Sequence, residues 1–439
     1  MQRIRRYRGE QFDYLLSNNP DDLLDELLRD FPEDRDGLRS FFRTARKLGE
    51  GFERFGVNMR AKQTKTLLEN LRALFRMTVA GIPFMRYSGV SADKGLSRFF
   101  HGPILDRMWR SEAGVIACLM PVAWAYAGNY QRPPAGGSRR IISWMASVCE
   151  DAEVRVSYRT RAERIVLDGR RATAVRYSRN GDREALDEIR CRHVVAACDG
   201  RIVYRDLLPH GATSARFRER VEAAETYDSA VSVFLGLSSP VAELGMDEEI
   251  VHISRSGITR AEHTAGDPDK TAINVMAPSI TDPTLAPPGK ATLILHAPGR
   301  IADNDHWQTG PDLSRTDAYY EFKQRFTDVM IDRVERNLGV DLRSRIEVSE
   351  TATPVTFGRY TGSRDGAIMG FKPTVGNVRA RLARLITPVP NVLVGGQWAM
   401  VGGGLPAAVG AGANAAAYLL QAERPQAFAE LRDVMDGQG

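Results

Sequence analysis

The sequence predicts an α/β protein of the α+β type, in which a parallel strand–helix region encloses an antiparallel sheet. Two apolar runs, HVVAA at 193–197 and NVLV at 391–394, are typical of parallel strands that are buried on both faces. Between them, strand-like runs separated by turn residues from Tyr227 to His296 favour an antiparallel sheet with one covered face. Apolar residues at helical spacing dominate the first 135 residues.

The N-terminal part, residues 1–132, is therefore expected to be mostly helical. Asn19 and Pro20 form a helix-start signal, and the leucines that follow recur at helical spacing until Pro32 stops the pattern. A second helix is expected near 34–47, and further helices near 64–77 and 96–109.

Residues 133–200 predict a loop, a helix and a strand meander. The loop PPAGGSRR at 133–140 opens an amphipathic helix that runs through Val148. Strand-like runs follow near 154, 164, 172 and 189, and the two central runs flank Gly169, which favours a hairpin turn. After the apolar run, Asp199 is interpreted as a turn residue rather than a catalytic group.

Residues 201–345 carry the antiparallel sheet and a long helix, expected at about 316–338 with Gly339 as its stop signal. In residues 346–439, the stretch from Val389 to Leu420 carries no charge, and it is long enough for a membrane span. Its many glycines, together with Pro390 and Pro406, favour a buried strand–turn–helix instead.

Composition and charge narrow the function classes. The chain has 439 residues, a formal net charge of +5 and a pI of about 9.0. Dispersed basic residues without an aromatic platform argue against nucleic-acid binding. The histidines form no metal-binding spacing. Four arginines lie within the first eight residues: Arg3, Arg5, Arg6 and Arg8. We expect this terminus to be solvated, and contact with an anionic membrane or an acidic protein stays open.

The cysteines point to the compartment. They show no C-x-x-C spacing, which argues against zinc and paired redox sites, and four cysteines in so long a chain fit a reducing, cytoplasmic setting. No signal peptide is recognisable, so we expect a cytoplasmic protein with at most peripheral membrane contact. The four are Cys118, Cys149, Cys191 and Cys198.

The segment GGQWAMVGGGLPAAVGAG at 395–412 joins a strand end to a helix with a glycine-rich N-terminus. Such a turn brings backbone N–H groups close to the negative or polar edge of a cofactor. Together with PAGGS at 134–138, VVAACDG at 194–200 and TATPVTFGRYTGSRDGAIMG at 351–370, it resembles the phytoene desaturase-like family of flavin oxidoreductases. That family includes carotenoid desaturases, carotenoid isomerases and retinol saturase.

The resemblance runs over nearly the whole chain and implies a fold. It implies a glutathione-reductase-like FAD domain, here incomplete, with an inserted substrate domain of antiparallel sheet and helices. Residues 1–132 would then be a helical substrate-binding part and 133–200 part of the FAD domain. Residues 201–345 would form the substrate sheet and helix, and 346–439 the C-terminal part of the FAD domain.

The resemblance also implies cofactor-binding positions. In the family, the last strand brings the backbone to the flavin, a helix N-terminus faces the isoalloxazine and pyrophosphate, and a glycine loop precedes the meander. Val401 departs from the pattern, since relatives often carry proline there. The matching residues are Gly395, Gly396 and Gln397; Gly402, Gly403, Gly404, Leu405 and Pro406; and Gly136, Gly137 and Ser138.

The family pattern begins with a strand, a G-x-G-x-x-G turn, a helix and an acidic residue, and no such unit occurs near Met1. We expect a second polypeptide to supply this unit and share the FAD, because the two buried strands need neighbours in their sheet. A truncated gene product is the alternative.

The expected reaction changes double bonds in a conjugated polyene, by desaturation or by cis/trans isomerisation. A carotenoid-like substrate and a polyketide polyene, free or bound to an acyl carrier protein, stay open. Arg359 and Tyr360 are the only side chains suggested near the reaction, and a structural role for them is equally compatible with the sequence. A non-catalytic polyene-binding or scaffold subunit is the second hypothesis, although the glycines at 395–396 and 402–404 argue against it.

Overall fold

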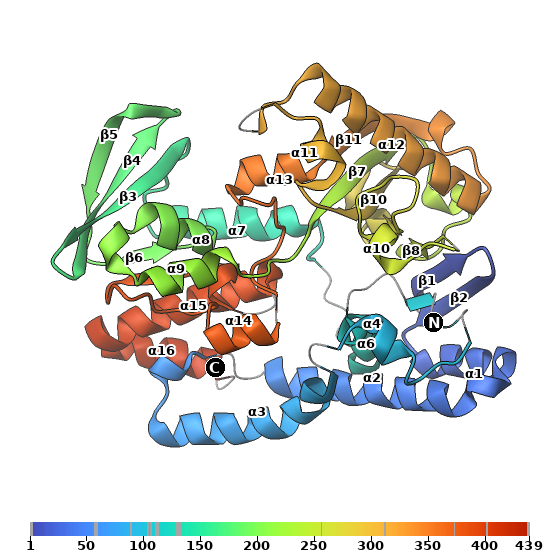
Figure 1. The fold of residues 1–439 in the computed structure, drawn as a ribbon, viewed down its shortest axis with the longest axis horizontal. Coiled ribbons are helices and arrows are strands. Elements are labelled where there is room, and N and C mark those ends of the chain that lie inside the picture. The colour runs from blue at the N-terminus through green and yellow to red at the C-terminus, as the bar shows by residue number, and fades with distance from the viewer. Residues whose placement is uncertain are drawn as a thin grey trace. The chain divides into compact units, whose positions relative to one another are not determined.

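The computed structural model describes residues 3–56, 60–87, 90–102, 105, 108–109, 114–128, 133–255, 257–310, 313–372, 374–400 and 403–436. The chain forms two compact units, each assembled from three segments (Figure 1). Unit 1 comprises Met1–Arg54, Val79–Val148 and Ser229–Thr356, and unit 2 comprises Phe55–Thr78, Cys149–Asp228 and Phe357–Gly439. The functional names given to the four sequential blocks stay predictions.

Unit 1 contains a seven-stranded sheet in the order β11-β7-β10-β9-β8-β1-β2. The four runs predicted from Tyr227 to His296 pair antiparallel as expected, and among the described strands of this sheet β1 and β8 are the one parallel pair. The strands are β1 (Arg3–Gly9), β2 (Phe12–Ser17), β7 (Ser229–Leu237), β8 (Ile250–Ile253), β9 (Ile273–Met276), β10 (Ala291–Gly299) and β11 (Ile346–Ala352).

The long helix α12 (Asp317–Leu338) covers one face of this sheet. Its buried Tyr319, Phe326 and Met330 share one core cluster with the buried residues of β7 and β10. Thr316 caps the helix by accepting from the Tyr319 amide, and Gly339 ends it with a φ of 70°. The predicted helix and its stop signal are therefore confirmed.

The N-terminus differs from the prediction of a solvated, basic end. β1 and β2 form a hairpin at the edge of the sheet, in which Ile4 and Tyr7 are buried. Two arginines of β1 have an acidic partner far along the chain: Arg3 and Arg6 both contact Glu248, whose side chain is 1% exposed. These pairings join residues more than 240 positions apart, so the local sequence gave no sign of them.

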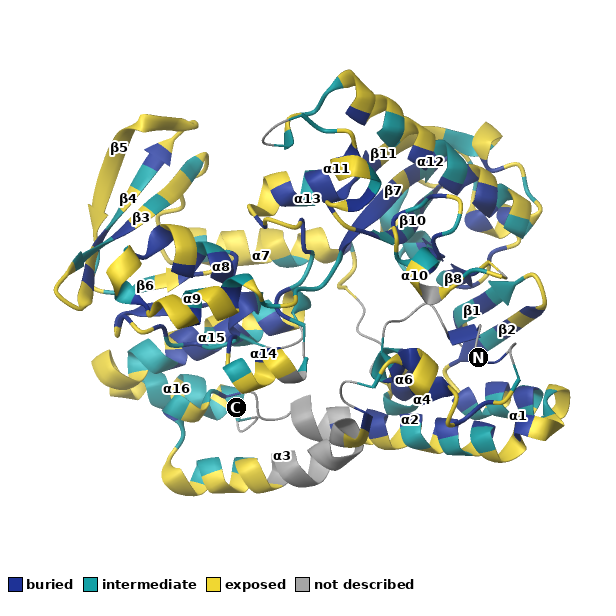
Figure 2. Ribbon diagram, in the orientation of Figure 1, coloured by how far each residue is buried: buried dark blue, intermediate teal, exposed yellow. Residues whose placement is uncertain are grey.

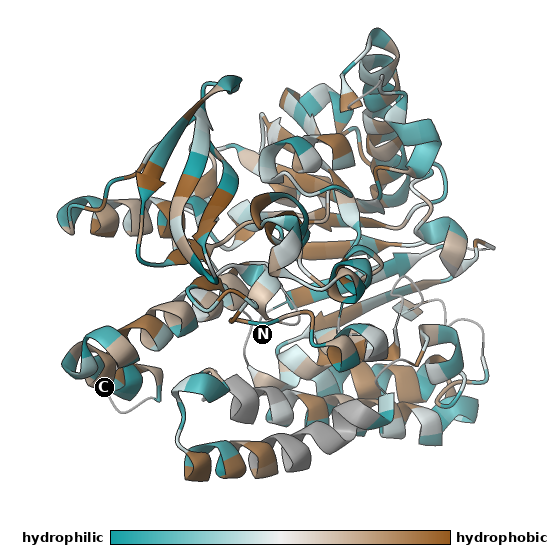
Figure 3. Cartoon of the chain, turned by 60° about the vertical axis from the view of Figure 1, so that its left-hand side comes forward, coloured by the Kyte–Doolittle hydropathy of each residue, from teal (hydrophilic) through white to brown (hydrophobic). Residues whose placement is uncertain are grey.

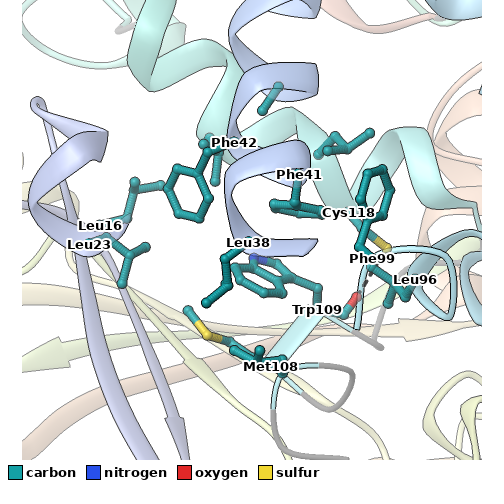
Figure 4. Close-up of a cluster of buried hydrophobic side chains, with 14 of the residues drawn as sticks. Leu16, Leu23, Leu38, Phe41, Phe42, Leu96, Phe99, Met108, Trp109 and Cys118 are labelled. Carbon is teal, nitrogen blue, oxygen red and sulfur yellow. Dashed lines mark hydrogen bonds between the residues drawn. The ribbon is translucent and has the colours of Figure 1, made fainter. Parts of the chain in front are cut away.

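A helical layer with an aromatic core completes unit 1. Phe41 of α2 contacts the Trp109 ring at a centroid distance of 4.6 Å and lies within 5.5 Å of the Phe99 and Phe100 rings (Figure 4). The helix predicted at 96–109 is wrong in its first part, because a short helix ends at Leu96 and 97–102 are not helical; several of the later residues lie outside the described ones. The helices within unit 1 are α1 (Pro20–Asp30), α4 (Ala92–Leu96), α6 (Val115–Ala127), α10 (Arg260–His263) and α11 (Asp303–Trp307). The helices that run across the division between units are α2 (Arg35–Gly56), α3 (Leu67–Tyr87), α7 (Ser138–Asp151) and α13 (Pro354–Thr361).

Unit 2 combines a strand meander with a two-stranded parallel sheet. The meander is antiparallel in the order β3-β4-β5, and its first turn contains Gly169 as predicted. Apolar and polar residues are interspersed along its strands (Figure 3), and β5 is exposed along its whole length (Figure 2). The run VRVSYR at 154–159 does not form a strand. The elements are β3 (Thr160–Asp168), β4 (Arg171–Arg179), β5 (Asp182–Arg190), β6 (Val194–Ala196), β12 (Val392–Val394), α8 (Gly200–Ile202), α9 (Ala215–Glu222), α14 (Val375–Ala380), α15 (Gly404–Glu423) and α16 (Pro425–Met435).

The two apolar runs do pair as parallel strands, with Leu393 of β12 opposite Val195 of β6. Asn391 anchors the meander to this sheet through two buried hydrogen bonds, to both backbone groups of Ala172, and a partly buried one to the Arg192 carbonyl. Within 389–400 and 403–420 the chain forms the predicted strand and helix, and residues 401–402 between them lie outside the described ones. Among the described residues, no helix has the length and apolar character needed to cross a membrane.

Candidate functional site

The predicted cofactor turn begins where β12 ends, at Gly395 and Gly396. A Cβ atom on Gly395 would lie 2.4 Å from a methyl group of Val195, and one on Gly396 would lie 2.6 Å from the Ala197 carbonyl oxygen. The two glycines therefore allow the ends of β12 and β6 to lie against each other. Their structural role is to let the two strand ends pack closely, and at these two positions no side chain covers the backbone.

The turn is fixed to the start of α15 by Gln397. Its Oε1 accepts from the Gly404 amide at 2.9 Å, and its Nε2 donates to the Ile368 carbonyl at 3.5 Å. Gly403 and Gly404 have φ values of 71° and 81°, and a Cβ on Gly403 would lie 2.8 Å from the Cβ of Met369. Only glycine fits this position without strain. Gly402 lies outside the described residues.

The N-terminus of α15 is open. Its N-cap, Gly403, offers no side-chain acceptor, and the first turn of this 20-residue helix contains no acidic residue. Leu405 and Pro406 are exposed there. Gln397 is a neutral partner for the Gly404 amide, so no negative charge offsets the partial positive charge at this end of the helix dipole. The residues present are therefore compatible with the polar or anionic edge of a cofactor, and their role as cofactor-binding residues stays a prediction.

A buried ion-pair cluster lies beside this turn, and sequence reasoning missed it. Asp199 caps α8 by accepting from the Arg201 amide at 2.8 Å, which agrees with its interpretation as a turn residue. The Arg201 guanidinium lies 3.0 Å from Asp199 and 2.6 Å from Asp365, and 5.5 Å from the centre of the Trp398 ring. Burial lowers the pKa of Arg201, but its bonds to Asp199 and Asp365 outweigh this and raise it above the ordinary value. The cluster ties two chain segments, 199–201 and the one that carries Asp365, to Trp398, the residue that follows Gln397.

Arg359 and Tyr360 do not join the glycine turn. They are exposed at the end of α13, with Tyr360 87% exposed, and they line an open hollow with residues of the meander. The lining of this hollow includes none of the predicted cofactor residues.

The glycine loop before α7 belongs to unit 1. Gly136 and Gly137 have φ values of 88° and 76°, and Ser138 begins the helix. The Gly136 amide donates to Asp282 at 2.7 Å. A hydrogen bond from Thr284 and those from the loop amides hold the pKa of Asp282 below its ordinary value. The Gly136 amide is therefore already hydrogen-bonded to Asp282. The sequence did not indicate this partner, because it lies 146 residues away.

One edge of the parallel sheet is open. On its outer side β12 is covered, because the Val394 amide donates to the Leu385 carbonyl and Leu393 forms a bridge with Ile386. β6 pairs with β12 alone among the described residues, and its apolar Val195 is 44% exposed. On α15, Leu405 and Val409 are 39% and 50% exposed. An unpaired parallel strand beside exposed apolar side chains is a surface on which a further strand can pair.

Sequence identity to known proteins quantifies the family resemblance. The chain is 24% identical to a chloroplastic prolycopene isomerase of Daucus carota over 381 residues, which are 82% of this chain and 56% of that protein. It is 24% identical to a lycopene-forming phytoene desaturase of Pseudescherichia vulneris, over 65% of this chain and 55% of that enzyme. It is 23% identical to a lycopene-forming phytoene desaturase of a Paracoccus strain, over 94% of this chain and 79% of that enzyme. The chain is similar to carotenoid desaturases and isomerases. It spans little more than half the length of the first two, and no family model matches it.

Solved structures show the same fold at low identity. A cyclohexylamine oxidase from Brevibacterium oxydans superposes with a TM-score of 0.51 at 15% identity, covering 96% of this chain and 81% of the oxidase. A putrescine oxidase gives 0.52 at 11% identity, over 96% and 82% of the two chains. The mixed α/β fold of this chain is thus similar to the fold of these two oxidases.

Proposed function

We propose that this chain is a subunit of an FAD-dependent oxidoreductase that desaturates or isomerises a conjugated polyene. The observation that carries the proposal is the glycine-rich connection from the end of β12 to the N-terminus of α15, where the N-cap Gly403 has no side chain and the first turn has no acidic residue. Its similarity to carotenoid desaturases and an isomerase supports the substrate class.

The residues of the turn have separate tasks in this proposal. Gly403 and Gly404 keep the start of α15 accessible, and Gln397 holds their backbone in place from the strand side. Arg201, with Asp199 and Asp365, holds the Trp398 segment and so acts as a positioning residue. When bound, FAD supplies the hydride chemistry, and the protein supplies binding, orientation and exclusion of water.

We further propose that a second polypeptide adds a parallel strand at the open edge of β6 and shares the FAD. The exposed Val195 and the exposed apolar residues of α15 support this, because a strand followed by a helix would cover both. The partner would carry the G-x-G-x-x-G turn that this family pattern requires.

The experiment compares Gly403→Val with Gly289→Val in the flavin-loaded protein. Gly289 has a similar φ of 75°, but a Cβ there meets nothing within 4 Å, so the control carries the backbone strain alone. We expect Gly403→Val to lose flavin and polyene turnover, while Gly289→Val keeps both. Equal flavin content and turnover in the two variants would refute the assignment. A polyene-binding subunit without catalysis would bind polyene in Gly403→Val as in the unaltered protein.

A further inference from the structure

The hollow next to Arg359 is basic and has no role in the proposed flavin site. It has a volume of about 660 Å³ and opens to solvent. Three elements of unit 2 form it: the start of β3, the turn between β4 and β5, and the end of α13. Its lining contains no acidic residue and consists of Arg159, Thr160, Arg161, Asn180, Gly181, Arg359 and Tyr360.

The positive charge of the hollow is largely uncompensated. Within the described residues, no carboxylate pairs with Arg159 or Arg359, and the only partner of Arg161 is Glu163 at 3.6 Å. Glu163 is itself shared with Arg183 and accepts a hydrogen bond from Ser178. The nearby acids of β5 are also engaged, as Asp187 pairs with Arg179 at 2.7 Å and Asp182 accepts two backbone amides of its own strand.

The backbone around the hollow is held in a defined shape. Asn180 and Gly181 form the hairpin turn with φ values of 52° and 85°, a conformation that the Asn-Gly pair favours. The Asn180 amide donates to the Arg159 carbonyl at 2.8 Å, which fixes the start of β3 against this turn. The backbone of Arg159 is therefore fixed by this hydrogen bond, and Arg159 lines the hollow together with Arg359 and Tyr360 at the end of α13.

We propose that this hollow binds a phosphate group of a small ligand. Guanidinium groups present planar pairs of N–H donors that match phosphate oxygens, and several of them around one concave surface bind a doubly charged anion more strongly than they bind chloride. The phenol of Tyr360 and the side-chain amide of Asn180 add neutral donors at the rim. The phosphate belongs either to a free anion such as pyrophosphate or to a nucleotide, and both present the same group.

The test is calorimetric titration of the full chain with inorganic pyrophosphate and, separately, with ADP. We expect Arg159→Gln and Arg359→Gln each to weaken pyrophosphate binding about tenfold, because each removes a charge-assisted contact. Arg325→Gln, which changes an exposed arginine of α12 instead, should leave the affinity unchanged. Circular dichroism spectra of all variants establish that they remain folded.

The two ligands and one further variant separate the alternatives. Tighter binding of ADP than of pyrophosphate would assign the phosphate to a nucleotide, and equal binding would assign it to the anion alone; both support the site. Gly403→Val should retain pyrophosphate binding, because the hollow does not depend on the flavin turn. If pyrophosphate binds only weakly at millimolar concentration, or if Gly403→Val abolishes binding that Arg359→Gln retains, the proposal is wrong.

Discussion

Asn391 is the strongest single link between the meander and the parallel sheet. Its amide makes three hydrogen bonds of 2.7–2.8 Å, two to Ala172 and one to Arg192, and the residue is 2% exposed. A net hydrogen bond contributes about 1 kcal/mol, so Asn391→Ala should lower the free energy of unfolding of unit 2 by about 3 kcal/mol. Asn391→Asp should cost at least as much, because it places a carboxylate oxygen against the carbonyls of Ala172 and Arg192.

The assay is urea unfolding combined with hydrogen exchange of peptides from β4 and β12. The matched control is Asn337→Ala, which removes one side-chain bond, to the Arg333 carbonyl within α12, and should cost no more than about 1 kcal/mol. Faster exchange in β4 and β12 is expected for the Asn391 variants alone. If Asn391→Ala lowers the free energy of unfolding as little as the control does, the argument that this side chain joins the two sheets is refuted.

Two further changes test the buried charges. Arg201→Met should destabilise unit 2 by about 3 kcal/mol, because it leaves Asp199 buried without its partner, and Asp199→Asn in the same background should recover part of the loss in urea unfolding. Burial, and secondarily the charge of Arg5, lowers the pKa of His252 to about 4, below its ordinary 6.5. The unfolded chain therefore gains a proton at His252 before the folded one does, and between pH 6.5 and pH 5 the stability of unit 1 should fall by about 2 kcal/mol. In His252→Phe this part of the pH dependence should disappear. If the free energy of unfolding of His252→Phe falls with pH as steeply as that of the unaltered protein, the assignment to His252 is wrong.

The elements with strong local signals could be predicted from the sequence. Gly339 and Thr316 bound α12 as the pattern indicated, Gly169 turns the meander, and the apolar runs around Val195 and Leu393 pair in parallel. The helix ends and the turn depend on residues close together in the chain. Each apolar run is also a local signal, although its partner strand lies far away in the sequence. The Asn180–Gly181 turn carried an equally strong local signal that the sequence analysis overlooked.

The remaining features depend on distant partners. The N-terminal hairpin is ordered by pairing with β8 and by Glu248, and the buried Arg201 depends on Asp365, 164 residues later. At the candidate site, the sequence predicted the bare glycine turn but not Gln397 as its clamp to Ile368. Arg359 and Tyr360 were suggested from their place in a motif, and the structure instead places them in a basic hollow.

The visible absorption spectrum of the purified protein tests the central claim most directly. It would be recorded for the chain alone and for the chain co-expressed with candidate proteins that carry a G-x-G-x-x-G turn. We predict flavin absorption bands in a co-purifying pair, with loss of the bands in Gly403→Val and not in Gly289→Val. Absence of flavin from every sample would contradict the proposal that this chain forms part of a flavoenzyme.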